Sequence, residues 1–323
     1  MPPFRQPGRR QFRQAMRSKE MPLRIASLSG ILVVVALTFL LPPVAPQQDR
    51  AASERHVIFA VWKSMSGEGS APRGSRPFID AVAVVDGGRY LPPPPPWFEP
   101  GKDLAPEALR FEEQYFASGK KYAVYIGGEH AGTVEVIKPE TITCASLSAV
   151  VRGTGALEDD DVRALATSLP ISPRTPAASR RPTPEEEAAA LELAGSVFRV
   201  HGARSSALRR IRIERLVLSD LDRDQRAEMV GTFSLRDKAE RTLLLVAGPG
   251  DKGFKAEMAW HYLSSGAADD HQQRSLVDHL DLDGDGVDEL IVRMEDHEGW
   301  QYGIYKKDKK GWKLVYTGGG GGC

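Results

Sequence analysis

Two short acidic stretches constrain the fold of this chain more than any other feature of the sequence. They begin at Asp220 and Asp281, 61 residues apart, and each has aspartates at positions one, three and five and a glutamate at position nine. Apolar residues alternate with polar ones before and after both stretches, which is typical of β-strands. The C-terminal part of the chain is therefore an internal repeat of about 110 residues, built from two similar β units.

The acidic residues of each stretch indicate a cation site. Ionised carboxylates at this spacing repel one another, and a hard cation such as Ca²⁺ removes that repulsion by binding to carboxylate and carbonyl oxygens. An EF-hand loop beginning at Asp281 would need a glutamate at position twelve, but Val292 stands there in a strand-like run. Closure at position nine by Glu289, followed by a strand, resembles the FG-GAP and VCBS repeats, the blade repeats of integrin-alpha-like β-propellers.

The resemblance implies a ligand set for each loop. In the second loop it implies calcium bound by the side chains of Asp281, Asp283, Asp285 and Glu289 and the carbonyl of Val287, with Gly286 in the left-handed conformation. In the first loop the matching positions are Asp220, Asp222, Asp224, Arg226 and Glu228. The second loop fits the pattern more closely. In the first, Gln225 replaces the glycine, and the arginines at 223 and 226 could neutralise the acidic residues without a metal.

Two repeats are too few for a closed propeller, which needs at least four blades. We therefore expect the two units to pack against each other and against the helix that precedes them. Completion of a ring by oligomerisation is the alternative. The final glycine run, Gly318 to Gly322, is expected to form a flexible tail.

The N-terminal segment predicts export. Residues 1–24 are basic, and residues 25–41 form an uncharged apolar run that would span about 25 Å as a helix. Prolines 42 and 43 end the run, and the basic residues before it place the N-terminus in the cytoplasm. Two interpretations stay open. One is an uncleaved membrane anchor with extracytoplasmic C-terminal domains, and the other is a cleaved signal peptide that leaves a secreted or periplasmic protein.

Between the export segment and the repeats, the pattern predicts a small α+β domain over residues 54–168. We expect strands over 56–62, 79–85, 121–126, 132–137 and 146–151 and a helix over 106–116. A proline-rich linker, residues 169–184, follows. A helix capped by Thr183 and Glu186 then opens the 185–317 region of the repeats. The predicted fold class is mainly β with α+β content, ending in two blade-like repeats.

The sequence favours a binding or scaffold protein of the bacterial cell envelope over an enzyme. The net charge is zero, which gives no reason to expect a nucleic-acid partner, and the glycines of 248–253 fit a hairpin turn better than a nucleotide site. The expected partner is a protein or a carbohydrate. One alternative is a hydrolase in residues 56–160, where Glu112, Glu113, Glu129 and His130 are the only ingredients. Another is a metal-free structural module. Pairing of Cys144 with Cys323 stays open.

Overall fold

The computed structural model describes residues 54–63, 77–95, 104–140, 146–153, 163–172, 179–251, 253–266 and 270–322. These residues belong to one compact unit, Ala51–Cys323. The predictions for residues 1–24 and 25–41 and for the pair Cys144 and Cys323 lie outside the described residues. Within the described ranges, no helix has both the length and the apolar content needed to cross a membrane.

Six strands of the N-terminal region form a closed antiparallel barrel in the order β1-β7-β4-β5-β6-β2. Pairing of β1 with β2 closes the ring, and β3 adds to the outer side of β2. The strands are β1 (His56–Lys63), β2 (Pro77–Asp86), β3 (Arg89–Leu91), β4 (Lys121–Ile126), β5 (Glu129–Pro139), β6 (Ser148–Gly153) and β7 (Arg163–Thr167). The predicted strands of this region are confirmed. The sequence predicted neither β7 nor the closure of the sheet.

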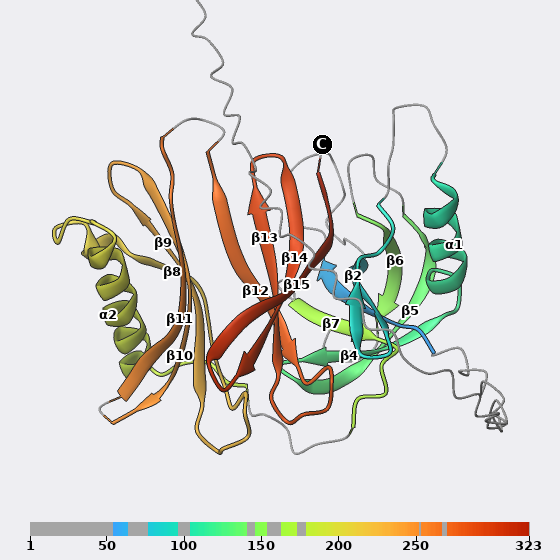
Figure 1. Cartoon of the computed structure of the whole chain (residues 1–323), viewed down its shortest axis with the longest axis horizontal. Coiled ribbons are helices and arrows are strands. Elements are labelled where there is room, and N and C mark those ends of the chain that lie inside the picture. The colour runs from blue at the N-terminus through green and yellow to red at the C-terminus, as the bar shows by residue number, and fades with distance from the viewer. Residues whose placement is uncertain are drawn as a thin grey trace, which may run out of the picture. The chain divides into compact units, whose positions relative to one another are not determined.

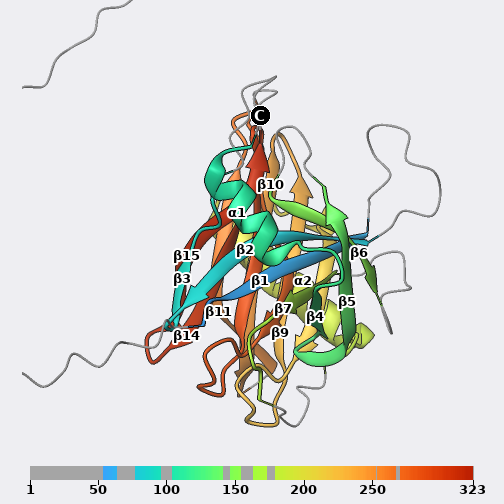
Figure 2. The ribbon, with the colours of Figure 1, turned by 90° about the vertical axis from the view of Figure 1, so that its right-hand side faces the viewer.

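Strand β1 is buried on both faces, which explains its unbroken apolar sequence. Val57, Phe59 and Val61 point into the barrel core, and the alternating residues Ile58 and Ala60 join a second core outside the barrel. Helix α1 (Pro106–Tyr115) begins with a proline in its first turn, as predicted, and buries Ala108, Phe111 and Tyr115 in the barrel core. Figure 2 shows α1 lying over the barrel.

The C-terminal region forms two four-stranded antiparallel sheets in which each strand pairs with the next. The first sheet consists of β8 (Arg212–Ser219), β9 (Glu228–Arg236), β10 (Glu240–Gly250) and β11 (Gly253–Leu263). The second sheet consists of β12 (Gln272–Leu280), β13 (Glu289–Asp296), β14 (Gly299–Asp308) and β15 (Gly311–Gly322). The mainly β fold is confirmed, and the two repeats correspond to two sheets of the same strand order. The glycines of 248–253 lie at the β10–β11 hairpin, as predicted.

Helix α2 (Pro184–Val200) covers the outer face of the first sheet. Its predicted capping box is present: the Thr183 side chain accepts a hydrogen bond from the Glu186 N–H, and the Glu186 side chain accepts one from the Thr183 N–H. Ala190, Ala194 and Phe198 pack against apolar side chains of β9 and β10. The short 3₁₀ helix η2 (Leu208–Arg210) leads from α2 into β8.

The faces of both sheets are covered, so the pair does not need to close into a ring. Val230 and Leu244 of the first sheet share a core with Leu290 and Val292 of the second. The other face of the second sheet shares a core with the barrel. Figure 1 shows the resulting order across the molecule: α2, first sheet, second sheet and barrel. The expected packing of the repeats against each other and against the preceding helix is confirmed.

The prediction of a flexible glycine tail is wrong. Gly318–Gly322 belong to β15, whose end pairs with the start of β14. A Cβ atom at Gly319 would meet the carbonyl oxygen of Ala81 in β2, and one at Gly320 would meet the carbonyl oxygen of Trp300. Glycine is needed here because the backbones approach too closely for a side chain.

Candidate metal centre

The two acidic loops occupy the same position in the two sheets. The first joins β8 to β9 and the second joins β12 to β13, so each connects the first and second strands of its sheet. The glutamate at position nine of each loop, Glu228 or Glu289, is the first residue of the second strand. Position nine therefore has the rigid backbone of a strand, whereas the aspartates at positions one to five lie on the loop.

Backbone hydrogen bonds to Asp281 shape the second loop. Its Oδ1 accepts a hydrogen bond from the Gly284 N–H at 2.7 Å, and its Oδ2 accepts one from the Gly286 N–H at 3.0 Å. Gly284 and Gly286 have φ angles of 79° and 100°, a region that residues with a Cβ rarely adopt. The prediction that Gly286 is left-handed is confirmed, and the loop wraps around the carboxylate at position one.

Glu289, the first residue of β13, closes the second loop at its C-terminal end. Its Oε2 accepts a hydrogen bond from the Leu282 N–H at 2.8 Å. The residue is fully buried, and its Oε1 has no hydrogen-bond partner among the described residues. Burial, reinforced by the nearby Asp283, raises the pKa of this carboxyl to about 7. A cation beside Oε1 stabilises the ionised form, and the Lys306 ammonium, 3.3 Å from this atom, is one such cation.

A lysine ammonium lies among the acidic residues of the second loop. Oxygen atoms of Asp281, Asp283 and Asp285 lie within 4.8 Å of one another. Lys306 of β14 forms an ion pair with Asp283, and its Nζ lies 2.8 Å from Asp285 Oδ2 and 3.3 Å from Glu289 Oε1. The structure thus places three of the four predicted carboxylates around the Lys306 ammonium, and the fourth, Asp281, clusters with Asp283 and Asp285.

Val287 was predicted to contribute its carbonyl. In the structure, the Val287 N–H donates a hydrogen bond to Asp285 Oδ1 at 2.9 Å. This bond orients Asp285 in the loop, and the ligand role of the carbonyl stays a prediction.

The first loop shares two of the backbone hydrogen bonds described for the second but lacks the one from position four to the first aspartate. The Gln225 N–H donates to Asp220 Oδ2 at 3.0 Å, and the Leu221 N–H donates to Glu228 Oε2 at 2.8 Å. Arg223 and Gln225 hold positive φ angles of 62° and 68° at the positions of the two glycines. The loop therefore keeps the wrapped shape with residues that are poorly suited to it.

The acidic residues of the first loop gather differently. Oxygen atoms of Asp220, Asp222 and Glu228 lie within 4.8 Å of one another, without Asp224. Asp224 Oδ1 accepts a hydrogen bond from the Arg226 N–H at 2.8 Å, as Asp285 Oδ1 does from the Val287 N–H in the second loop. Burial raises the pKa of Glu228 to about 7. Each loop thus offers three clustered carboxylates. The cluster of the first loop includes the glutamate at position nine, and that of the second includes the aspartate at position five.

Sequence reasoning missed a buried network that joins the two loops. Asp288 is fully buried, with Oδ2 2.8 Å from His279 Nδ1 and Oδ1 3.0 Å from Arg223 Nη2. Its backbone N–H donates to the Leu221 carbonyl at 2.8 Å. Arg223 thus pairs with an aspartate of the second loop. One difference in the sequence could have indicated this network: position eight is Asp288 in the second loop but Ala227 in the first.

The β4–β5 turn of the barrel contacts the base of the second loop. The Gly127 N–H donates a hydrogen bond to the buried carboxylate of Asp278, with N–O distances of 2.9 and 3.0 Å. A Cβ atom on Gly128 would lie 2.8 Å from Asp288 Oδ2. Two glycines thus allow the barrel to approach the backbone and acidic residues that carry the candidate site.

A second buried polar network connects the barrel with the second sheet. Asp80 accepts hydrogen bonds from the Ser146 hydroxyl at 2.7 Å and the Tyr302 hydroxyl at 3.0 Å, and Trp62 Nε1 donates to the Tyr302 oxygen at 3.1 Å. Burial raises the pKa of Asp80 to about 6, against the lowering effect of these hydrogen bonds. Because Asp80 is only 5% exposed, the network holds two parts of the molecule together and is not open to a substrate.

The four ingredients of the hydrolase alternative lie on different elements. Glu112 and Glu113 are on α1, whereas Glu129 and His130 begin β5. Among the described residues, the acidic or histidine groups compact enough to hold a metal ion are the two loop clusters. The hydrolase alternative for residues 56–160 stays a prediction.

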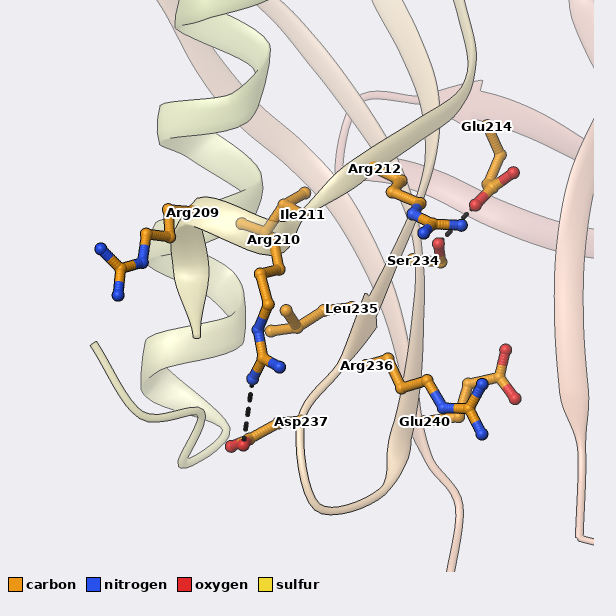
Figure 3. A pocket seen from close by; sticks show the side chains of 10 residues that line it. All are labelled: Arg209, Arg210, Ile211, Arg212, Glu214, Ser234, Leu235, Arg236, Asp237 and Glu240. Carbon is orange, nitrogen blue, oxygen red and sulfur yellow. Dashed lines mark hydrogen bonds and ion pairs between the residues drawn. The ribbon is translucent and has the colours of Figure 1, made fainter. Parts of the chain in front are cut away.

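A pocket of about 760 Å³ beside β8 and β9 is lined by four arginines and three acidic residues (Figure 3). Arg210 points toward Asp237, which also binds Arg204, and Arg209 points away from the other side chains. Arg236 lies opposite Glu240 in the β9–β10 pair. The guanidinium groups do not converge on one point, so the pocket is a mixed-charge surface and not an anion site.

In comparisons with known proteins, no family model, no curated protein and no solved structure matches this chain.

Proposed function

We propose that this chain is a calcium-binding interaction or scaffold protein and that its main cation site is the second acidic loop. The supporting observation is the fully buried Glu289, whose Oε1 faces the same ammonium group, that of Lys306, as Asp283 and Asp285 do. Calcium prefers such oxygen-rich, flexible sites, where it would neutralise the carboxylates and fix the loop. The loop joins two strands of a sheet that contacts both the first sheet and the barrel, so calcium would stabilise the arrangement of all three parts.

Calorimetric titration of the full chain with calcium tests this proposal. We expect Asp283→Ala to remove the strongest binding event, because Asp283 belongs to the cluster and is partly exposed, so its loss leaves the fold intact. Asp222→Ala should affect only weaker binding at the first loop. Asp251→Ala, in the exposed β10–β11 turn, is the matched control and should bind as the wild type does. Absence of binding by the wild type would reject the proposal.

We place the protein at the bacterial cell envelope, either anchored by residues 25–41 or released after cleavage. The basic segment before the apolar run supports this location. The partner would be a protein or a carbohydrate bound outside the cytoplasm. Fractionation of cells that express the chain with and without residues 1–46 tests the location, and a cytoplasmic full-length chain would contradict it.

A metal-free structural module is the second candidate function, and the position of Lys306 favours it. An ammonium that already neutralises Asp283, Asp285 and Glu289 could hold the loop without calcium. This candidate predicts the same melting temperature in excess calcium and in excess chelator. A calcium-dependent rise in melting temperature would favour the calcium-binding protein.

A further inference from the structure

We propose that Lys306 is a built-in competitor for the cation of the second loop. Its ammonium neutralises the carboxylates when no divalent ion is bound, and calcium must displace it to bind. Lys306 would then set the calcium concentration at which the loop fills. This inference rests on the proposed function and adds a mechanism that regulates the same site.

The geometry makes the two cations mutually exclusive. Lys306 Nζ contacts Asp283 and lies 2.8 Å from Asp285 Oδ2 and 3.3 Å from Glu289 Oε1, so it occupies the space between three of the predicted ligands. Calcium requires oxygen ligands at about 2.3–2.6 Å. A divalent ion at this distance from the same oxygens would meet the ammonium at close range, and the two positive charges would repel each other.

The Lys306 side chain is able to leave the cluster. It is 26% exposed, and it extends from β14 toward a loop at the surface, where Asp283 and Asp285 are also exposed. A lysine side chain is long and flexible, and its ammonium is strongly hydrated in water. Release therefore requires rotation of one side chain and leaves the pairing of β14 with β13 and β15 intact.

The next residue, Lys307, provides a natural comparison. Neighbouring residues of a strand point to opposite faces, and Lys307 reaches the first loop instead. Its Nζ lies 3.2 Å from Asp222 Oδ2 and 3.1 Å from Glu257 Oε2 of β11. Lys307 contacts one acidic residue of the first loop, whereas Lys306 contacts three of the second. Competition of the kind proposed for Lys306 is therefore specific to the second loop.

The first test compares calcium binding by the wild type, Lys306→Met and Lys307→Met in calorimetric titrations of the full chain. We expect Lys306→Met to bind calcium at least about tenfold more tightly at the second loop, as loss of a competing ion pair predicts. Without calcium, the same variant should melt at a lower temperature than the wild type, because three carboxylates lose their counter-charge. Lys307→Met should leave the affinity of the second loop unchanged. Equal affinities of the wild type and Lys306→Met would overturn the inference.

The second test needs no variant and therefore does not depend on whether Lys306→Met folds. The wild type is treated briefly with an amine-acetylating reagent, with and without calcium, and the modified lysines are quantified by mass spectrometry. We expect calcium to increase acetylation of Lys306 several-fold, because displacement frees its ammonium from the ion pairs. The exposed Lys309 and Lys310 are internal controls. Binding of calcium without a change at Lys306 would contradict the inference.

The two tests separate this inference from the proposed function. If neither the wild type nor Lys306→Met binds calcium, both are rejected. If only Lys306→Met binds, the wild type is not a calcium-binding protein, and the competition by Lys306 is supported. If both bind with equal affinity, the proposed function stands and the competition is rejected.

Discussion

At the scale of single residues, the two loops differ in how well their side chains suit one backbone. Gln225 and Arg223 hold φ angles of 68° and 62° at positions where the second loop has Gly286 and Gly284. A residue with a Cβ atom loses about 1–2 kcal/mol in this conformation. The first loop tolerates the strain because its shape is fixed elsewhere. Arg223 is held by Asp288, and the Leu221 N–H by Glu228.

We predict that Gln225→Gly stabilises the protein by about 0.5–1 kcal/mol, since the relief of strain exceeds the entropy that glycine adds to the unfolded chain. The free energy of unfolding, measured in urea without calcium, checks this. Gly286→Gln makes the reverse exchange in the second loop and should destabilise by a similar amount or more. A destabilised Gln225→Gly protein would show that the side chain of Gln225 has a role beyond the backbone.

At the scale of structural elements, a buried ionic network ties the two loops together. Asp288 is the acceptor shared by His279 and Arg223, and its backbone N–H donates to the first loop. Neither His279 nor Asp288 is accessible to water. Removal of one partner of such a network leaves the others without a counter-charge or acceptor.

We predict that Asp288→Ala lowers the free energy of unfolding by about 3 kcal/mol, because it leaves Arg223 and His279 Nδ1 without their acceptor. Denaturation in urea measures the loss. Asp288→Asn keeps one side-chain oxygen as an acceptor and should lose less. Equal stability of the wild type and Asp288→Ala would mean that water or another group replaces the carboxylate.

At the scale of the whole molecule, the barrel and the second sheet share an apolar core around the buried carboxyl of Asp80. Its folded-state pKa of about 6 lies above its ordinary value of 3.8. The folded protein therefore favours the protonated carboxyl. The stabilising contribution of Asp80 is fully present below about pH 4 and is lost as the pH rises through 6.

We predict that ionisation of Asp80 makes the free energy of unfolding fall by about 3 kcal/mol as the pH rises from 4 to 7, as the difference between its folded and ordinary pKa values implies. Asp80→Asn, which cannot ionise, should remove this part of the pH dependence and keep one of the two acceptor oxygens that Ser146 and Tyr302 use. Urea denaturation at several pH values measures the effect. Asp251→Asn, in an exposed turn, is the control. An unchanged pH profile for Asp80→Asn would show that another group causes the dependence.

The sequence by itself determined the features that depend on neighbouring residues. The repeat of the acidic loops, the capping box at Thr183 and Glu186 and the hairpin at 248–253 were all predicted and are present. Their signals are local, because a cap or a turn is set by hydrogen bonds and φ angles within a few residues. The left-handed conformation at Gly286 belongs to the same class.

Only the tertiary structure decided which distant parts meet. The short strand Arg163–Thr167 completes the barrel by pairing with β1 and β4, although its own sequence is a weak strand signal. The glycine run of β15 is ordered by the backbones of β2 and β14. Lys306 reaches the second loop from another strand, and Trp62 meets Tyr302 across 240 residues. Such contacts depend on how whole layers pack, because each is weak alone and becomes favourable only once many form together.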